Sequence, residues 1–269
     1  MTHNQQVDLI RRCRGFIFDL DGTIYLGEEL LPGAQKVISL LRMAGRRFLF
    51  LSNKPLATRR DYAEKLTRLG IPCAENEVLN SLLVFTNHLK RTIPDARVLP
   101  VGEPLFERTL AGAGFVVTRN PDEADVVAVS FDRTFDYDKL DRAYRAAKRG
   151  AKLWATNPDK LCPMPGYELP DCGCMIAAIE AAAGRSFDLV VGKPSPLIVA
   201  AALDMLGLAA AECALAGDRL ETDMAMARNS GLIPILVLTG VTSREKAAGL
   251  QNSGVIVLEN IGELAEMLE

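Results

Sequence analysis

The sequence FIFDLDGTIY, residues 16–25, indicates which kind of fold this chain adopts. Residues 16–18 form an apolar run typical of a buried strand, and Asp19 and Asp21 follow where that strand is expected to end. Two like charges at the end of a core strand are unfavourable unless a cation binds beside them. The stretch therefore predicts a metal or phosphate site, with an ordinary Asp-Gly turn after a strand as the alternative.

Three other apolar runs also end in polar residues. RFLFLSN ends at Ser52 and Asn53. DLVVGKP reaches Lys193, and CALAGD ends at Asp218. Each run is short, almost continuously apolar and followed by a helix-like segment, as in parallel strands that are buried on both faces. Open parallel sheets bind ligands beyond the carboxyl ends of their strands, so these side chains are expected to converge with the first two carboxylates on one crevice.

The composition is that of a globular protein with ample material for a core. The chain has 269 residues, of which 49% are hydrophobic and 24% charged. Its net charge of −3 argues against a general nucleic-acid partner. The first residues lack the apolar core of a signal peptide, and no apolar run approaches the length of a membrane span. The expected location is the cytoplasm, with no membrane partner.

Cysteines and histidines limit the chemistry further. The six cysteines are expected to be free thiols, and the spacing of Cys172 and Cys174 does not match a zinc knuckle. His3 and His88 are the only histidines, so chemistry that needs a histidine base is not expected. The chain also lacks a P-loop, a dinucleotide fingerprint and a G-x-S-x-G nucleophile elbow.

The alternation of strand-like and helix-like segments predicts an α/β fold with parallel sheets. From about residue 79 the strand-like runs mostly lack the acidic residues of the first set. Residues 79–184 are therefore predicted to form an inserted second α/β domain, and residues 1–78 and 185–269 to form one core domain in two pieces. The predicted core is a doubly wound, Rossmann-like parallel sheet.

Carboxylates at the end of the first strand suit the steps of phosphoryl transfer. One carboxylate can attack phosphorus and form an acyl phosphate, while a neighbouring carboxyl protonates the leaving oxygen and later deprotonates water. Asp218 is expected to be a further ligand of Mg²⁺, which prefers oxygen ligands and binds phosphate oxygens. Asp223 is expected to support this site, or alternatively to lie at the start of a helix.

Several other residues are candidates for contact with a phosphate. Gly22 lets the backbone turn closely around the anion, and Thr23 is expected to cap a following helix or to touch the anion. Lys193 is expected to offset the negative charge of the nucleophile and the phosphoryl group, with a solvated loop lysine as the alternative. Ser52 and Asn53 are expected to donate hydrogen bonds to phosphoryl oxygens, unless they are ordinary turn residues.

The segments DLDGT (19–23), LSN (51–53), GKP (192–194) and GDRLETD (217–223), in this order, resemble the haloacid dehalogenase-like (HAD) phosphohydrolase superfamily. The long insert resembles the large α/β cap, type C2, of the NagD and p-nitrophenylphosphatase-like subfamily. Within that subfamily the chain is most similar to the sugar-phosphate phosphatases encoded with bacterial arabinose-utilisation genes. The resemblance implies a Mg²⁺-dependent phosphatase that hydrolyses small phosphomonoesters, sugar phosphates above all, through an aspartyl-phosphate intermediate.

The resemblance also implies individual roles. Asp19 corresponds to the nucleophile and Asp21 to the general acid and base. Mg²⁺ would be held by the Asp19 carboxylate, the Asp21 backbone carbonyl and the Asp218 carboxylate. Ser52 and Lys193 would hold the phosphoryl group.

The inserted domain is expected to act as a cap that closes over the core, excludes water and selects a small phosphorylated metabolite. Many relatives carry small glycines that face the substrate where this chain has ELPDCGCM, residues 168–175. Asp171, Cys172, Gly173 and Cys174 are therefore the candidate specificity residues. Because such caps often form dimers in relatives, a homodimer through the cap is also an expectation.

Two alternatives stay open at this point. One is a different reaction at the same aspartate, either phosphoryl transfer to another hydroxyl or dehalogenation; the fit of Asp21 and Asp218 to a cation disfavours dehalogenation. The other is a non-enzymatic receiver-like module, which also combines strand-end carboxylates, a lysine and Mg²⁺. The large insert and the early D-x-D pattern favour an enzyme over a receiver.

Overall fold

The computed structural model describes residues 1–164, 166–250 and 253–269. The chain forms two compact units, which we call the core unit and the inserted unit. The core unit comprises Met1–Ser52, Arg59–Leu79 and Ile198–Glu269, and the inserted unit comprises Asn53–Thr58 and Asn80–Leu197. The inserted unit thus takes in residues 53–58 and 185–197 besides the predicted insert. The predicted domain boundaries, which concern independent folding, stay a prediction.

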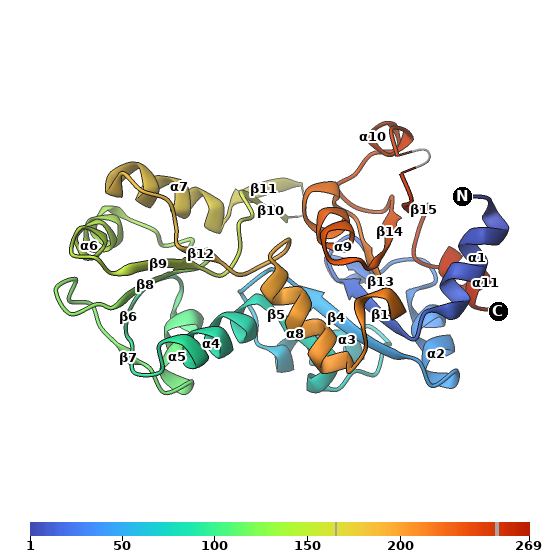
Figure 1. Ribbon diagram of the computed structural model, residues 1–269, viewed down its shortest axis with the longest axis horizontal. Helices are drawn as coiled ribbons and strands as arrows, with labels where there is room; N and C mark the ends of the chain where they lie inside the picture. Colours follow the sequence, from blue (N-terminus) through green and yellow to red (C-terminus); the bar gives the residue numbers. More distant parts are fainter. Residues whose placement is uncertain (165, 251–252) are drawn as a thin grey trace. The chain divides into compact units, whose positions relative to one another are not determined.

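The core unit is built on a six-stranded sheet in the order β15-β14-β13-β1-β4-β5 (Figure 1). β1 (Gly15–Asp19) lies inside the sheet and pairs in parallel with β13 (Cys213–Gly217) on one side and β4 (Arg47–Ser52) on the other. The remaining strands are β5 (Val78–Asn80), β14 (Ile233–Val237) and β15 (Ile256–Leu258). All five residues of β1 are buried, which explains its continuous apolar sequence.

The helices of the core unit are amphipathic and pack their apolar faces inward. In α2 (Ala34–Met43) the buried residues Ala34, Val37, Ile38 and Leu41 recur at helical spacing. α1 packs against α11, and α11 packs against α2, so both ends of the chain belong to this unit (Figure 1). The other helices of this part of the chain are α1 (His3–Arg12), α3 (Arg59–Arg68), α8 (Pro196–Leu206), α9 (Ala225–Ser230), α10 (Arg244–Ala248) and α11 (Glu263–Leu268).

Short elements connect these helices and strands. A two-stranded hairpin, β2 (Tyr25–Leu26) and β3 (Glu29–Leu30), follows the DLDGT segment. The remaining short turns are the 3₁₀ segments η1 (Glu75–Glu77) and η2 (Ala210–Glu212) and the π-helical turn η3 (Leu220–Met224). Among the described residues, no helix combines the length and apolar character needed to cross a membrane.

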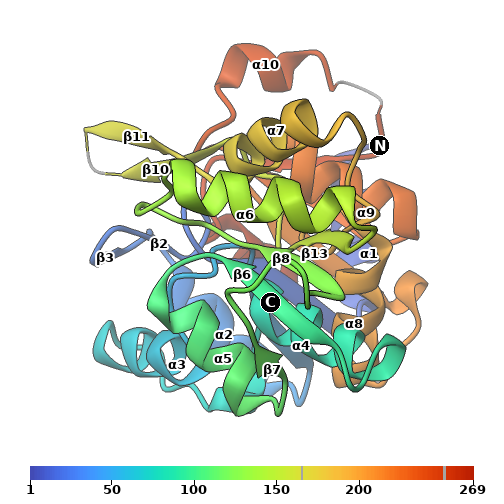
Figure 2. The same cartoon turned by 90° about the vertical axis from the view of Figure 1, so that its left-hand side faces the viewer.

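The inserted unit contains a parallel five-stranded sheet in the order β12-β9-β8-β6-β7. Helices α6 and α7 cover one face of the sheet, and α4 and α5 cover the other (Figure 2). The strands are β6 (Arg97–Val101), β7 (Val116–Val117), β8 (Val126–Val129), β9 (Lys152–Ala155) and β12 (Leu189–Val190). The helices are α4 (Ser81–Thr92), α5 (Pro104–Gly112), α6 (Tyr137–Lys148) and α7 (Cys172–Ala183).

Alternate residues of β9 face the two layers of helices. Leu153 and Ala155 join the apolar cluster under α6 and α7. Trp154 points the other way, where its ring lies 6.3 Å from that of Phe85 and 5.2 Å from that of His88, both in α4. An antiparallel hairpin of β10 (Leu161–Met164) and β11 (Tyr167–Pro170) connects β9 to α7.

The prediction that the run before Lys193 belongs with the strands that end at Asp19, Ser52 and Asp218 was wrong. This run forms β12, which pairs with β9 of the inserted sheet. An apolar run indicates a buried strand but carries no information about its partner. Here β9, α7 and β12 form a parallel crossover unit of the kind that keeps successive strands in one sheet.

Candidate active site

Three strand ends of the core unit come together on one edge of its sheet. Asp19 is the last residue of β1, Ser52 is the last residue of β4, and Asp218 directly follows β13. Because β13, β1 and β4 are adjacent and parallel, their carboxyl ends lie at the same edge. All three side chains are buried. Burial of the Asp19 and Asp218 carboxylates is unusual unless a nearby charge or hydrogen bonds compensate for it.

Three aspartates form a compact group of ligand atoms at this edge. Asp19, Asp218 and Asp223 each place a carboxylate oxygen within 4.8 Å of the others, and all three are buried. Asp223 lies in η3, where its Oδ2 accepts a hydrogen bond of 3.2 Å from the backbone N–H of Arg219. A set of carboxylate oxygens alone suits a hard divalent cation such as Mg²⁺. Asp223, which is predicted only as a supporting residue, thus belongs to the same compact group of oxygens as the predicted ligands Asp19 and Asp218.

Two glycines leave room for the Asp218 carboxylate. A Cβ atom at Gly22, whose φ is +85°, would lie 2.7 Å from Asp218 Oδ2, and a Cβ at Gly240 would overlap the same oxygen. The backbone N–H of Val241 donates to Asp218 Oδ2 at 2.7 Å. Thr239 Oγ1 donates to the Gly22 carbonyl at 2.6 Å. The loop 239–241 therefore fixes Asp218.

This loop was missed in the sequence, although its signal was present. The apolar run PILVLTG forms β14 and ends in polar residues at the same sheet edge, as the other runs do.

Asp21 and Thr23 lie in the turn after β1. Asp21 is half-buried, and the Gly22 N–H donates to the Tyr25 carbonyl at 2.8 Å to close the turn. Thr23 is fully buried, and its hydroxyl lies 3.5 Å from Asp19 Oδ2. The expected helix cap at Thr23 is wrong, because the chain continues into the β2–β3 hairpin. Thr23 instead contacts the carboxylate of Asp19.

Aromatic residues complete the core-unit side of the site. Ser52 Oγ donates to Tyr62 Oη, in α3, at 3.1 Å. Tyr25 is buried, with Lys65 Nζ 3.9 Å from the centre of its ring. Burial raises the pKa of Tyr25, and the nearby Asp21 carboxylate raises it further. Tyr25 therefore remains a neutral phenol. No sequence pattern singles out Tyr25, Tyr62 or Lys65 as a site residue, because each fits the pattern of its own element.

Lys193 and Asn53 belong to the inserted unit, and both are buried. The Lys193 N–H donates to Asn53 Oδ1 at 2.7 Å. Asn53 Nδ2 donates to the Lys193 carbonyl at 3.2 Å and to Asp159 Oδ2 at 2.9 Å. The Asn53 side chain is thus used within its own unit, which argues against its predicted hydrogen bond to a phosphoryl oxygen. The predicted phosphate contacts of Ser52 and Lys193 stay predictions.

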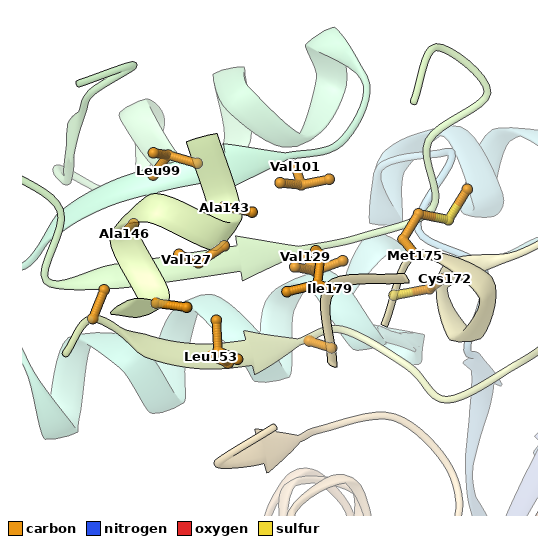
Figure 3. Close-up of a cluster of buried hydrophobic side chains, with 13 residues drawn as sticks. Leu99, Val101, Val127, Val129, Ala143, Ala146, Leu153, Cys172, Met175 and Ile179 are labelled. Atoms are coloured by element: carbon orange, nitrogen blue, oxygen red, sulfur yellow. The ribbon is translucent and has the colours of Figure 1, made fainter. Parts of the chain in front are cut away.

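The four candidate specificity residues lie at the start of α7. Asp171 is the N-cap of this helix and is buried, and burial raises its pKa to about 6. Cys172 belongs to the apolar cluster of the inserted unit, beside Val129 and Met175 (Figure 3). This position argues against the predicted contact of the Cys172 thiol with substrate.

Gly173 and Cys174 follow in the first turn of α7. A Cβ at Gly173 would lie 2.6 Å from the Pro158 carbonyl, so the glycine permits close packing of two backbone segments. Cys174 is exposed, and its thiol donates to the Lys160 carbonyl at 3.3 Å. Contact of Gly173 or Cys174 with substrate stays a prediction.

Comparison with known proteins agrees with this arrangement. Residues 16–116 match the family described as haloacid dehalogenase-like hydrolase, and residues 190–264 match the HAD-hydrolase-like family. The chain is 36% identical over 255 residues to the sugar-phosphatase AraL of Bacillus subtilis, covering 95% of this chain and 93% of the relative.

Solved structures of similar chains share the whole fold. The 4-nitrophenylphosphatase of Thermotoga maritima matches with a TM-score of 0.92 and 33% identity, covering 97% of this chain and 99% of that one. NagD of E. coli matches with a TM-score of 0.83 and 29% identity, covering 93% and 98% of the two chains. Strand-end aspartates, sequence identity and fold all lead to one conclusion: the chain belongs to the haloacid dehalogenase-like hydrolases, in the group that contains NagD and the p-nitrophenylphosphatases.

Proposed function

We propose that this chain is a Mg²⁺-dependent phosphatase that hydrolyses small phosphorylated metabolites, with sugar phosphates as the substrate class. The observation that carries the proposal is the group of buried carboxylates of Asp19, Asp218 and Asp223, whose oxygens lie within 4.8 Å of one another. The similarity to a sugar phosphatase over nearly the whole chain supports the choice of substrate class.

The residues at the sheet edge fit a divalent cation. Their ligand atoms are all oxygens, and Gly22 and Gly240 clear the space around the Asp218 carboxylate. Mg²⁺ would be held by the carboxylates of Asp19 and Asp218 and the backbone carbonyl of Asp21. When bound, the cation supplies positive charge that binds the phosphoryl oxygens and offsets their charge.

Asp19 is proposed to act as the nucleophile. One of its carboxylate oxygens forms a bond to phosphorus while the bond between phosphorus and the ester oxygen breaks, which yields an aspartyl phosphate. Asp21, which is half-buried, gives its proton to the departing ester oxygen. Asp21 then takes a proton from water as the water oxygen attacks phosphorus. The bond between phosphorus and Asp19 breaks, and inorganic phosphate leaves.

Ser52 and Lys193 are proposed to bind the oxygens of the phosphoryl group. A hydroxyl and an ammonium donate hydrogen bonds that strengthen as negative charge develops on these oxygens. Lys193 also contributes a positive charge, which favours the approach of the carboxylate of Asp19 to an anionic substrate.

Release of phosphate from p-nitrophenyl phosphate tests the proposal. The purified protein is expected to turn over this substrate with Mg²⁺ and to lose turnover when EDTA is added. Asp19→Asn keeps the size of the side chain but removes the nucleophile, so the expected rate is at least about 10³-fold lower. An active Asp19→Asn variant, or an inactive wild-type protein with Mg²⁺, would refute the proposal.

The cytoplasmic location and the homodimer through the inserted domain stay predictions. Size-exclusion chromatography with light scattering measures the mass of the particle in solution, and a monomer would contradict the predicted dimer.

A further inference from the structure

The chain passes between the core unit and the inserted unit at four places, and polar side chains bind these passages together inside the inserted unit. Ser81 Oγ donates to the Asn53 carbonyl at 2.7 Å, and Asn80 Nδ2 donates to the Ala57 carbonyl at 3.2 Å. The Asn53 side chain then joins the first passage to the segment around Lys193. Residues far apart in sequence are thus held at fixed separations.

The Asn53 side chain engages both backbone groups of Lys193. Its Oδ1 accepts from the Lys193 N–H at 2.7 Å, and its Nδ2 donates to the Lys193 carbonyl at 3.2 Å. The same Nδ2 donates to Asp159 Oδ2 at 2.9 Å, a charge-assisted bond that fixes the orientation of the amide. We call Asn53, Asp159 and the Lys193 backbone the clasp.

Further buried polar groups orient Asp159 in turn. Asn157 Nδ2 donates to Asp159 Oδ2 and to Asp171 Oδ1, both at 3.2 Å. Thr156 Oγ1 donates to Asn157 Oδ1 at 2.9 Å. This bond orients the Asn157 amide so that its NH₂ group points to the two aspartates. The residues named in this network all belong to the inserted unit.

A glycine lets the clasp close. A Cβ at Gly192, the residue before Lys193, would lie 2.6 Å from Asn53 Oδ1 and 2.8 Å from the Thr156 carbonyl. Only a residue without a side chain permits the backbone to approach Asn53 so closely. Gly192 and Asn53 are therefore matched parts of one arrangement.

The chemistry of the clasp separates it from direct phosphate binding. Both bonds from Asn53 to Lys193 go to backbone atoms, so they hold the Cα of Lys193 without using its side chain. The amide oxygen of Asn53 accepts from the Lys193 N–H, and its nitrogen donates to two acceptors. The Asn53 side chain therefore has little hydrogen-bonding capacity left for an anion.

We propose that Asn53 and Asp159 are positioning residues, which act on the reaction by holding the backbone of Lys193 and thereby placing its ammonium group. This role rests on the proposed function, in which Lys193 binds the phosphoryl group. A misplacement of about 1 Å at such a group lowers a rate by roughly a hundredfold.

A double-mutant cycle on Asn53 and Lys193 tests this role, with kcat/KM for p-nitrophenyl phosphate as the readout. Asn53→Ala is expected to lower kcat/KM by roughly 10–100-fold in the wild-type background. In the Lys193→Ala background the same change is expected to have less than about a threefold effect, because the ammonium group that it positions is already absent. Multiplicative effects of the two changes would overturn the proposal, since they would mean that Asn53 acts independently of Lys193.

A second variant covers the case in which Asn53→Ala does not fold. Asn53→Asp keeps the size of the side chain and an acceptor for the Lys193 N–H, but it removes both donors and adds a charge beside Asp159. We expect at least as large a loss of kcat/KM as for Asn53→Ala, while wild-type activity would contradict the role of the amide hydrogens.

Asn80→Ala is the matched control. Asn80 also joins two passages of the chain and caps α4, but it forms no hydrogen bond with Lys193 in the part of the chain that the structure describes. Its loss is expected to lower the melting temperature and to leave kcat/KM within about twofold. An equal loss of activity in this variant would show that the clasp effect is one of general stability. An inactive wild-type protein would refute the proposed function itself, whereas an active wild-type with a multiplicative cycle would refute only the clasp.

Discussion

At the scale of single residues, exposure separates the aspartates of the site. Asp19, Asp218 and Asp223 are buried, whereas Asp21 is half-buried. A group that exchanges protons with a leaving oxygen and then with water needs this access, whereas a cation ligand does not. Burial therefore divides the four carboxylates in the same way as their proposed roles.

Asp21→Asn tests this division of roles. Without a proton donor and acceptor, steady-state release of phosphate from a sugar phosphate is expected to fall by about 10²–10⁴-fold. p-Nitrophenolate leaves without a proton, so the first step with p-nitrophenyl phosphate is expected to stay fast and the second to become slow. Stopped-flow absorbance should then show a burst of p-nitrophenolate. A variant with wild-type steady-state rates on both substrates would exclude Asp21 as the acid and base.

Asp171 makes stability depend on pH in the inserted unit. Burial, and to a lesser extent the Asp159 carboxylate, raises the pKa of Asp171 from 3.8 to about 6. Between these two values the folded protein holds a proton that the unfolded chain releases, so this group destabilises the fold as pH rises. The total effect above pH 6 is about 3 kcal/mol.

Asp171→Asn should remove this pH dependence while keeping an oxygen that accepts from the Cys172 N–H as helix N-cap. The variant is expected to melt at a higher temperature than wild type above about pH 6, with the difference vanishing towards pH 4. Melting curves by circular dichroism across this range measure the difference. A difference that does not change with pH would contradict the assigned shift.

At the scale of elements, arginines bind the carboxyl ends of helices in the core unit. Arg46 Nη1 donates to the carbonyls of Ile10 and Cys13, at the end of α1, at 3.0 and 2.7 Å. Arg47 Nη1 donates to the carbonyls of Leu206 and Gly207 at the end of α8. Carbonyls at the end of a helix mostly lack a partner within it, although the Ile10 carbonyl also accepts from the Cys13 N–H at 3.1 Å. A cation there also interacts favourably with the helix dipole.

Removal of one such cap should cost stability without affecting catalysis. Arg46→Met keeps the aliphatic length and is expected to lower the free energy of unfolding by about 1–2 kcal/mol. Urea unfolding measures the change. Arg12→Met is the control, because Arg12 makes no hydrogen bond or ion pair with any residue that the structure describes, and a change within about 0.5 kcal/mol is expected. Equal losses of unfolding free energy in the two variants would mean that the hydrogen bonds of Arg46 contribute no stability beyond the effect of removing one positive charge.

At the scale of the whole molecule, all proposed cation ligands lie in one of the two units. Mg²⁺ should therefore stabilise the core unit selectively, by about 2.7 kcal/mol at a concentration of 100 times its Kd. Differential scanning calorimetry with Mg²⁺ or with EDTA is expected to show the shift, and Asp218→Asn is expected to abolish it. A shift of the same size in Asp218→Asn would place the cation elsewhere.

Local sequence patterns predicted the parallel α/β architecture and the edge at which Asp19, Ser52 and Asp218 meet. These features depend on residues that are neighbours in the sequence, because an apolar run that ends in polar residues indicates a strand and its carboxyl end. The sheet to which β12 belongs depends on pairing between distant segments, and no local pattern encodes such pairing. The same holds for the contact of Asn53 with Lys193, which joins residues 140 positions apart.

The burial of Trp154 against Phe85 and His88 gives the protein an optical probe, because the sequence contains a single tryptophan. Emission excited at the red edge of indole absorption comes from the inserted unit alone, whereas the far-ultraviolet signal averages over helices in both units. Coincident transitions in the two signals would indicate one cooperative molecule. Separate transitions would allow the stability of each unit to be followed in the same cuvette, without any label.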